Sequence, residues 1–432
     1  MGAATLYTVK DTMVEEEART KGLSWIDTAV MQACFSTAGA MVTFPYAVGI
    51  FGYVLAPCIL IAWTAVVLYT NLNITEAARR CNAKSFGDVG ENMAGPMGRH
   101  LATLFQMINL VFLLPVQLEL AGGSLAYLVG DTACLGVWTL VIFAAVFLLP
   151  VQACRTYTTS IWMSYVTIAV LLLKALVLFP IIFDTTRNPN MSQSPDARLA
   201  LAPVTQSWSD YAGALSLFPY SFTPIFVLVE NMSEMETPQK VDRALYAACA
   251  FSFLVYLFPG FFGVACWGYS INDPVTDGLE RNWMSELVNT FLLLAALNDY
   301  VIASVCVSKE TQLRLMPRMD VTSYALGDIL RWFALTLPYG LFAAIMATCV
   351  PSFGTLVGLL TSLTIGITNM TLPSFFSLCS PQRHAAVDWA LLIGGLGLGL
   401  SAFMLAGSVI ELEDLEWESF RAMFCGADGS RR

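Results

Sequence analysis

The stretch WIDTAVMQACFSTAGAMVTFPYAVGI, from Trp25 to Ile50, is long and apolar enough to cross a bilayer, but its middle suits a continuous helix poorly. Residues 36–40 are all small, and Pro45 removes a backbone N–H and clashes with the carbonyl four residues earlier. In hydrocarbon, a freed backbone group costs several kcal/mol unless protein or a water-filled cavity satisfies it. The stretch therefore predicts a membrane helix broken at mid-depth, where backbone groups meet a ligand. A kinked packing helix with a small-residue face is the alternative.

The composition of the whole chain is that of a membrane protein. Of its 432 residues, 56% are apolar and 12% are charged, whereas ordinary globular chains carry about 25% charged residues. Apolar runs of about 20 residues recur from Trp25 to Val409, so one polytopic membrane domain accounts for nearly everything. The net charge of −10 leaves no basic footprint for nucleic acid. Residues 1–24 are polar, and no cleavable signal is expected there.

Apolar windows and the residues that punctuate them predict eleven spans. They are 25–50, 54–77, 101–128, 134–152, 158–183, 211–233, 244–269, 284–307, 329–350, 354–379 and 387–409. The chain is thus expected to have a cytoplasmic N-terminal segment (1–24), a transmembrane domain (25–409) and an extracytoplasmic C-terminal tail (410–432).

Lysines and arginines give the orientation of these spans. If the N-terminus is cytoplasmic, the outer loops hold only Arg187, Arg198 and Arg281, and this asymmetry follows the positive-inside rule. An odd number of spans then puts the C-terminus outside the cell or in a lumen. The predicted cytoplasmic cations are Lys10, Arg19, Lys21, Arg79, Arg80, Lys84, Arg99, Arg155, Lys240, Arg243, Lys309, Arg314, Arg318, Arg331 and Arg383.

The sixth predicted span repeats the anomaly of the first. Its sequence YAGALSLFPYSFTPIFVLVENMSEMETP carries Pro219 and Pro224 five residues apart, which an uninterrupted helix cannot hold without unsatisfied carbonyls. Broken spans in the first and sixth positions are expected of two five-helix repeats with opposite topology, an architecture of secondary transporters. The sequence therefore predicts an all-α polytopic membrane protein with a 5+5 inverted repeat, broken helices 1 and 6, and an eleventh helix.

The sequence resembles the amino acid/auxin permease family over residues 25–409. The most specific motif is Glu230-Asn231-Met232-Ser233-Glu234-Met235-Glu236-Thr237-Pro238, where the family has a glutamate, a further acidic residue, a methionine and a proline at this spacing. The resemblance implies an amino acid transporter with the leucine-transporter-type inverted-repeat fold. Three further matches to family elements are Pro45-Tyr46-Ala47, Tyr220-Ser221-Phe222 and Gly263-Val264-Ala265-Cys266-Trp267-Gly268.

The chain departs from the family pattern at both breaks. Family members often carry glycine-x-glycine where this chain has Ala38-Gly39-Ala40, and glycine followed by histidine where it has Pro224 and Ile225. In amino acid carriers of this fold, exposed amides of the broken first helix are expected to hold the substrate carboxylate. The departures leave that role in place but leave the identity of the substrate open.

The candidates for substrate contact are groups at the two breaks and polar residues of neighbouring spans. Helix N-termini freed by the breaks favour an anionic group. Helix packing would also explain each polar side chain, so we expect about half of the set to touch ligand. The set is Ser36, Thr37, Ala38, Gly39, Ala40, Met41, Gln117, Tyr220, Ser221, Thr223 and Asn298.

Charged residues at membrane depth are rare and usually functional, and four occur here: Glu119, Lys174, Glu230 and Asp299. The resemblance implies that the fifth and eighth spans flank the site where sodium-coupled relatives bind a cation. The Lys174 ammonium could replace that ion, and a proton lost by Lys174, by Asp299 or by both would couple transport to a proton gradient. The alternative is a static lysine–carboxylate pair that pins two helices together.

Sodium coupling is the other possibility for this site. Ser304 and Ser308 are one turn apart on the eighth span and could offer hydroxyl ligands, alongside carbonyls of an unwound helix. Serines in membrane helices more often bond to their own backbone. Sodium-coupled amino acid symport is one alternative to proton coupling. A transporter-like amino acid sensor is another, and residues 1–24 are the segment of the chain that would be free to bind its cytosolic partners.

An intramembrane enzyme is disfavoured because the motifs of catalysis are missing. The two histidines, His100 and His384, are far apart, and no metal box, Cys-x-x-Cys pair, phosphate loop or nucleophile elbow occurs. We therefore expect a secondary active transporter, proton-coupled, without cofactor or structural metal. Its expected partners are a small amino acid or related organic acid, a coupling proton or sodium ion, and the lipid bilayer. A monomer in the plasma, vacuolar or lysosomal membrane is expected.

Overall fold

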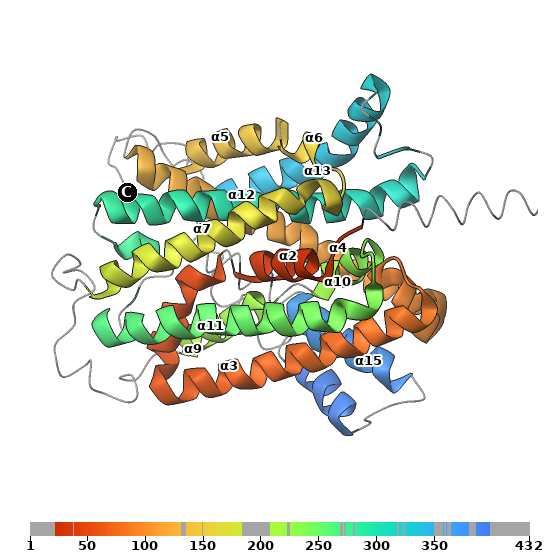
Figure 1. Cartoon of the computed structure of the whole chain (residues 1–432), viewed down its shortest axis with the longest axis horizontal. Coiled ribbons are helices and arrows are strands. Elements are labelled where there is room, and N and C mark those ends of the chain that lie inside the picture. Colours follow the sequence, from red (N-terminus) through yellow and green to blue (C-terminus); the bar gives the residue numbers. More distant parts are fainter. Residues whose placement is uncertain are drawn as a thin grey trace, which may run out of the picture.

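The computed structural model of the chain is an assembly of helices joined by turns (Figure 1). One isolated β-bridge joins Leu23 to Met235 within the described part. The structure describes residues 22–397, apart from 38, 131–134, 149, 184–207, 223–224, 268–270, 272–273, 280, 318, 322, 324, 350–356, 358–359, 361–363 and 380–385. The N-terminal segment before residue 22, the tail 410–432, Ala38, Thr223 and Pro224 thus lie outside the described residues.

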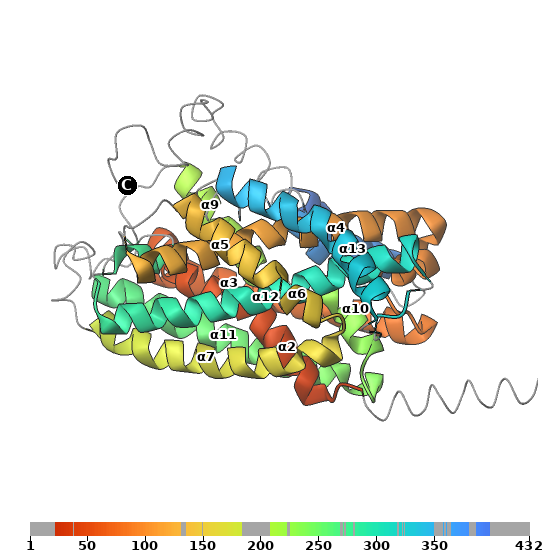
Figure 2. The same ribbon diagram turned by 90° about the horizontal axis from the view of Figure 1, so that it is seen from above.

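Within the described residues, seven helical stretches are long and apolar enough to cross a membrane. Several of them, including α3, α7, α11 and α12, run along the long axis of the molecule (Figure 2). The helices that form the seven stretches are α3 (Ala40–Cys81), α4 (Phe86–Val129), α5 (Leu135–Leu148) with α6 (Pro150–Ala153), α7 (Tyr157–Phe183), α11 (Val241–Trp267) with η2 (Pro238–Lys240), α12 (Trp283–Leu315) and α13 (Leu326–Cys349).

Two of these helices are kinked at glycine. α3 holds the end of the first predicted span and all of the second, with Gly52 between them at φ 76°. α4 turns at Gly95, φ 69°, and only then enters the third span. Glycine is the residue that adopts positive φ without steric cost. The predicted join at 78–100 is therefore mostly helical, because Ser85 caps α4 through a capping box with Asp88.

The two predicted interruptions are confirmed. In the first span, α2 (Trp25–Thr37) ends where small residues follow, and α3 begins at Ala40. In the sixth span, α9 (Trp208–Ser221) and α10 (Ile225–Ser233) are separate helices. Pro45 lies inside α3 rather than at the break, and Pro219 lies in the last turn of α9.

The tenth and eleventh predicted spans are described in part. The tenth contains a π-helical turn, η5 (Ile367–Thr371), that continues into α15 (Leu372–Leu378). The eleventh contains an apolar helix, Ala386–Gly397, that packs on the tenth span. A Cβ added at Gly395 would lie 2.8 Å from the Gly366 carbonyl oxygen, so these two segments are in close backbone contact.

The outer face of α7 shows how the bundle meets lipid. Leu172, Leu173 and Leu176 are 50%, 47% and 67% exposed, whereas Lys174 between them is 0% exposed. Apolar side chains therefore point outward, as the bilayer requires, and the charged residue of this helix points into the protein. α12 is buried along most of its length and packs against α4 and α7, so it lies at the centre of the bundle.

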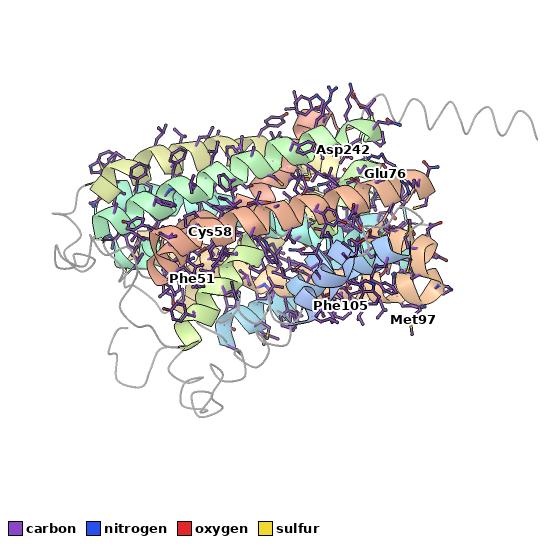
Figure 3. All side chains as sticks on the ribbon, turned by 90° about the horizontal axis from the view of Figure 1, so that it is seen from below. Phe51, Cys58, Glu76, Met97, Phe105 and Asp242 are labelled. Carbon is purple, nitrogen blue, oxygen red and sulfur yellow. The ribbon has the colours of Figure 1, made fainter. Side chains whose placement is uncertain are left out.

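Two cations that the sequence predicts to be cytoplasmic, Arg79 and Lys309, lie at one end of the bundle, which we call the basic end. It includes Arg79, which donates to both carboxylate oxygens of Asp242 at 3.0 Å, and Lys309, which pairs with Glu234 just after α10 ends. Glu76 and Asp242 lie together there, and Phe51 lies at the other end of the molecule (Figure 3).

Candidate substrate and ion site

The two helix breaks lie side by side and are bridged by one side chain of α11. The Tyr256 hydroxyl lies 2.7 Å from the carbonyl oxygen of Ser36, near the end of α2. It lies 2.6 Å from the carbonyl oxygen of Ser221, the last residue of α9. Tyr256 is 0% exposed. The last carbonyls of a helix have no partner within that helix, and the one Tyr256 hydroxyl lies within donating distance of a carbonyl from each helix end.

Aromatic rings hold this junction together. The Phe44 ring, just after the first break, stacks on Tyr256 at 5.1 Å and meets Phe218 edge-on at 5.2 Å. Phe222, at the second break, meets Tyr256 edge-on at 5.3 Å. The Phe222 carbonyl accepts a hydrogen bond of 3.3 Å from the Asn369 amide of η5. Backbone groups freed at mid-depth are therefore met by buried protein donors.

The hydroxyl groups predicted to touch substrate bond instead to their own helices. Ser36 donates to the Gln32 carbonyl at 2.9 Å, and Thr37 donates to the Ala33 carbonyl at 2.7 Å. In the same way, the Ser221 hydroxyl donates to Leu217 in α9 at 2.6 Å. These are the back-bonds expected of serine and threonine in membrane helices. The hydroxyl hydrogens of these side chains are thus already engaged, and a ligand would have to donate to their oxygen atoms.

The other candidate substrate residues are buried close to the breaks. Ala40 and Met41 are in the first turn of α3 and are both 0% exposed. Gln117 of α4 reaches Tyr220 of α9, with 3.5 Å between the amide nitrogen and the phenol oxygen. Neither amide atom of buried Asn298 meets hydrogen-bond geometry with a described residue. An unpaired buried amide is costly, which makes Asn298 available for a ligand.

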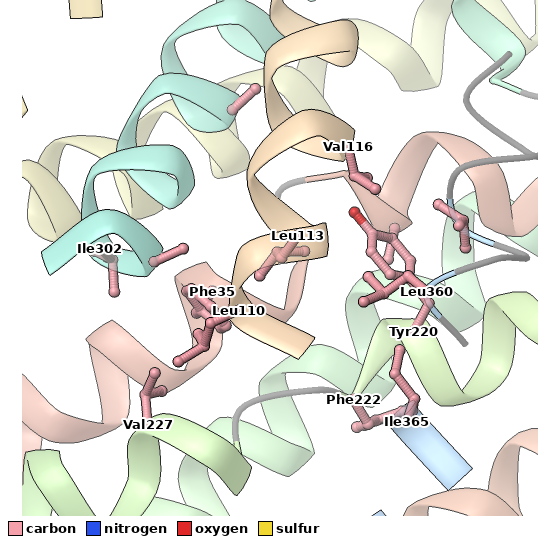
Figure 4. Close-up of a cluster of buried hydrophobic side chains, with 14 of the residues drawn as sticks. Phe35, Leu110, Leu113, Val116, Tyr220, Phe222, Val227, Ile302, Leu360 and Ile365 are labelled. Carbon is pink, nitrogen blue, oxygen red and sulfur yellow. The ribbon is translucent and has the colours of Figure 1, made fainter. Parts of the chain in front are cut away.

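Apolar side chains surround the breaks on the remaining sides. Phe35 of α2 and Leu110 of α4 lie between Leu113, Val227 and Ile302 (Figure 4). All five belong to one buried cluster that joins α2, α4, α10 and α12. The environment beside the freed backbone is therefore hydrocarbon-like.

Lys174 and Asp299 are both buried and lie within electrostatic range of each other. Lys174 of α7 is 0% exposed and Asp299 of α12 is 1% exposed, and their charges interact. Neither Asp299 oxygen meets hydrogen-bond geometry with a described residue. Cys34 of α2, whose thiol donates to the Ser164 carbonyl at 3.1 Å, is within electrostatic range of Asp299, as is Tyr256. The pair therefore sits where α2, α7 and α12 meet, directly beside the first break.

The candidate serines of α12 follow this pair toward the basic end. Ser304 and Ser308 are 5% and 1% exposed, and the Ser308 hydroxyl has no hydrogen-bond partner among the described residues. Glu119 is buried in α4, two residues after Gln117. The structure therefore leaves both serines available as oxygen ligands.

Glu230, the fourth intramembrane charge, ties α10 to α4. Its Oε1 accepts hydrogen bonds from the Phe86 backbone N–H at 3.1 Å and from the Gln106 amide at 2.7 Å. Phe86 is the first residue of α4, so the carboxylate sits at the positive end of that helix. These bonds hold Glu230 at a helix start, and its predicted part in ion coupling stays a prediction.

Replacing Glu230 with alanine is expected to destabilise the protein by about 3 kcal/mol, because two buried donors lose their acceptor. Glu230→Gln keeps one carbonyl acceptor at the same place, and its midpoint of thermal unfolding is expected to lie between that of Glu230→Ala and the wild type. The measurement is thermal unfolding in detergent, with exposed Glu236→Ala as the matched control. Equal midpoints for Glu230→Ala and Glu236→Ala would contradict the helix-capping role.

Sequence reasoning missed three residues that complete the site: Tyr256, Cys34 and Asn369. Each sits in an apolar span and resembles ordinary packing residues. The only sequence signal for Tyr256 is Ser252, one turn earlier, which places two hydroxyls on one face of an apolar helix. Their roles depend on contacts between distant spans.

Comparisons with known proteins agree with this geometry. The chain is similar in structure to a sodium-coupled sialic acid symporter in a substrate-bound outward-open state, with 13% identity, a TM-score of 0.56 and coverage of 90% of this chain and 91% of that chain. It is also similar to MhsT in complex with L-phenylalanine, with 13% identity, a TM-score of 0.59 and coverage of 88% of this chain and 98% of that chain. At this identity the likeness shows the shared leucine-transporter-type fold alone.

A family match covers almost all of the chain. The profile described as transmembrane amino acid transporter protein matches residues 21–409. This match confirms the resemblance to amino acid/auxin permeases that the motifs indicate. It also confirms a multi-pass membrane transporter in place of an enzyme. The chain therefore belongs to the transmembrane amino acid transporter family.

Proposed function

We propose that this protein is a secondary active transporter that moves amino acids or related small organic acids by alternating access, coupled to protons through Lys174 and Asp299. The single observation that carries the coupling proposal is the burial of Lys174 and Asp299 within electrostatic range of each other, near the first helix break. A charge pair at that depth is costly to bury. It supports coupling because one proton removed from Lys174, or added to Asp299, changes the charge at the junction of α2, α7 and α12.

We further propose an architecture of eleven spans, with two inverted repeats of five and an eleventh helix. Its support is the position of the breaks, in the first and sixth predicted spans, and the meeting of α2 and α9 at Tyr256. In such folds the substrate lies at the interface of the repeats near the midplane. The basic end is proposed to face the cytoplasm, in keeping with the positive-inside rule.

For the substrate, we propose a neutral amino acid. Its carboxylate would lie at the start of α3, against the amides of Gly39, Ala40 and Met41, where the helix N-terminus favours an anion. Tyr220, Gln117 and Asn298 would contact its polar groups. The apolar side chains of Phe35, Leu110, Leu113, Val227 and Ile302 favour an uncharged side chain over a charged one, because a buried charge without a partner is costly.

Sodium-coupled symport is the second candidate. A specific observation favours it: the buried Ser308 hydroxyl, one turn from Ser304 on α12, has no hydrogen-bond partner in the part of the chain that the structure describes. One structural neighbour is described as sodium-coupled, and the likeness extends to fold alone. A third candidate is a sensor that binds an amino acid and signals from the membrane. A carrier accumulates its substrate in an uptake assay, whereas a sensor only binds it.

The test is uptake by the purified protein in proteoliposomes, with a panel of neutral, acidic and basic amino acids. Proton and sodium gradients are imposed separately. We expect accumulation of a neutral amino acid with an inward proton gradient, abolished by a protonophore and unaffected when sodium is replaced by choline. Accumulation that requires sodium would instead support the second candidate, and binding without accumulation would support the sensor.

A further inference from the structure

The oxygen atoms at the end of α2 and at the end of α9 converge on one buried point. The carbonyls of Ser36 and Ser221 lie 2.7 Å and 2.6 Å from the Tyr256 hydroxyl, so both broken helices direct an acceptor at the same place. Both residues are in the last turn of their half-helix. Carbonyls at the C-terminal ends of half-helices are the groups that coordinate sodium ions in transporters with broken helices.

The Tyr256 hydroxyl has one hydrogen to donate, whereas two carbonyl oxygens lie within reach of it. A phenol has one O–H, so Tyr256 donates to one carbonyl at a time, while the other faces the same hydroxyl oxygen. The hydroxyl of Ser252, one turn earlier on α11, lies near the Tyr256 hydroxyl as well. Two carbonyls, a phenol oxygen and a serine hydroxyl thus form a group rich in oxygen in an otherwise apolar region, which would suit a small cation.

Aromatic packing holds the Tyr256 ring between the ends of α2 and α9. Phe44 stacks on the Tyr256 ring and Phe222 meets it edge-on. Gly260, one turn later, lets α11 approach α3, because a Cβ there would lie 2.8 Å from Cγ2 of Val48. The ring is therefore clamped from both broken helices and cannot leave without repacking them.

We propose that the Tyr256 hydroxyl occupies the place of a coupling cation at the junction of the two broken helices, so that this junction is held together without sodium. The proposal deepens the transport function proposed above, and its meaning for coupling rests on that function. It places Tyr256 as a positioning residue that fixes α2 and α9 relative to each other. It also predicts that removing the phenol creates a site for a small cation where none is bound in the wild type.

The test is thermal unfolding of purified variants in detergent, in sodium chloride and in choline chloride at equal ionic strength. The wild type is expected to show no sodium-specific shift. Tyr256→Phe keeps the ring but loses the donor, and is expected to melt about 5 °C lower in both salts. Tyr256→Ser leaves space and an oxygen, and sodium is expected to raise its midpoint by about 3 °C relative to choline.

The control is Tyr300→Phe, which removes the hydroxyl of another buried tyrosine. It is expected to melt like the wild type. The proposal is overturned if Tyr256→Phe also melts like the wild type, if the wild type itself has a sodium-specific shift that Tyr256→Phe removes, or if folded Tyr256→Ser does not respond to sodium. If Tyr256→Ser does not fold, the first two comparisons decide. These readouts need no transport, so a failure of uptake would refute the proposed function separately.

Discussion

Replacement of Lys174 by methionine is expected to reduce proton-driven accumulation by about 100-fold, the upper range of coupling between two ligands. Methionine keeps an unbranched side chain in the space that Lys174 fills but removes the ionisable group. The variant leaves the buried Asp299 carboxylate without its counter-charge, which costs about 3–5 kcal/mol if Asp299 stays ionised. We therefore expect Lys174→Met to bind a proton on Asp299 permanently, and uptake to lose its dependence on the imposed pH gradient.

The double variant Lys174→Met/Asp299→Asn separates coupling from simple packing. It removes both charges together, so stability is expected to return toward that of the wild type. If the pair only pins α7 to α12, gradient-driven uptake should return with stability. If the pair carries the coupling proton, the double variant folds normally, but it lets substrate equilibrate across the membrane without accumulating it. Leu173→Met, at the neighbouring lipid-facing position of α7, is the matched control.

The second large effect is expected at the basic end, where Glu234 joins four segments of the chain. Its carboxylate pairs with Lys309 of α12 and accepts from the Thr158 backbone N–H at 3.3 Å, at the start of α7. Its backbone carbonyl accepts from the Leu23 N–H at 2.8 Å, just before α2. The Lys309 ammonium also lies 5.0 Å from the centre of the Tyr157 ring. We call this set of contacts the basic-end latch.

Lys309→Glu places two carboxylates in the basic-end latch and is expected to open that end of the bundle. Direct charge pairs couple by about 0.5–3 kcal/mol, which corresponds to about 2- to 150-fold in a conformational equilibrium. Buried Cys306, one turn before Lys309, reports the opening. Its alkylation by a thiol reagent, followed by mass spectrometry, is expected to rise within that range, while exposed Cys379 is unchanged.

The swap Lys309→Glu/Glu234→Lys is the matched control for this prediction. It restores opposite charges at the same two positions, so most of the protection of Cys306 is expected to return. Loss of the Thr158 acceptor leaves the restoration incomplete. Equal labelling of Cys306 in the wild type and in Lys309→Glu would show that the basic-end latch does not hold this end closed.

Local chemistry predicts the elements of this protein well. Small residues before Ala40 and the prolines of the sixth span predict both helix breaks, because a break depends on the backbone of the residues concerned. The inward charge of α7 could also be anticipated, since lipid excludes it. The sequence predicts a join at residues 51–53, where Gly52 makes its kink, but not the positive φ of Gly52, because glycine permits that conformation without requiring it.

The composition and pattern of the sequence by themselves determined that this is a polytopic helical membrane protein with two broken spans and a buried lysine. The tertiary structure alone decided which groups meet. It brings Lys174 within electrostatic range of Asp299, which the sequence could only propose, holds Glu230 at the start of α4, and sets Tyr256 between the carbonyls of Ser36 and Ser221. The physical reason is that bilayer energetics act on each span separately, whereas contacts between spans depend on how the helices pack.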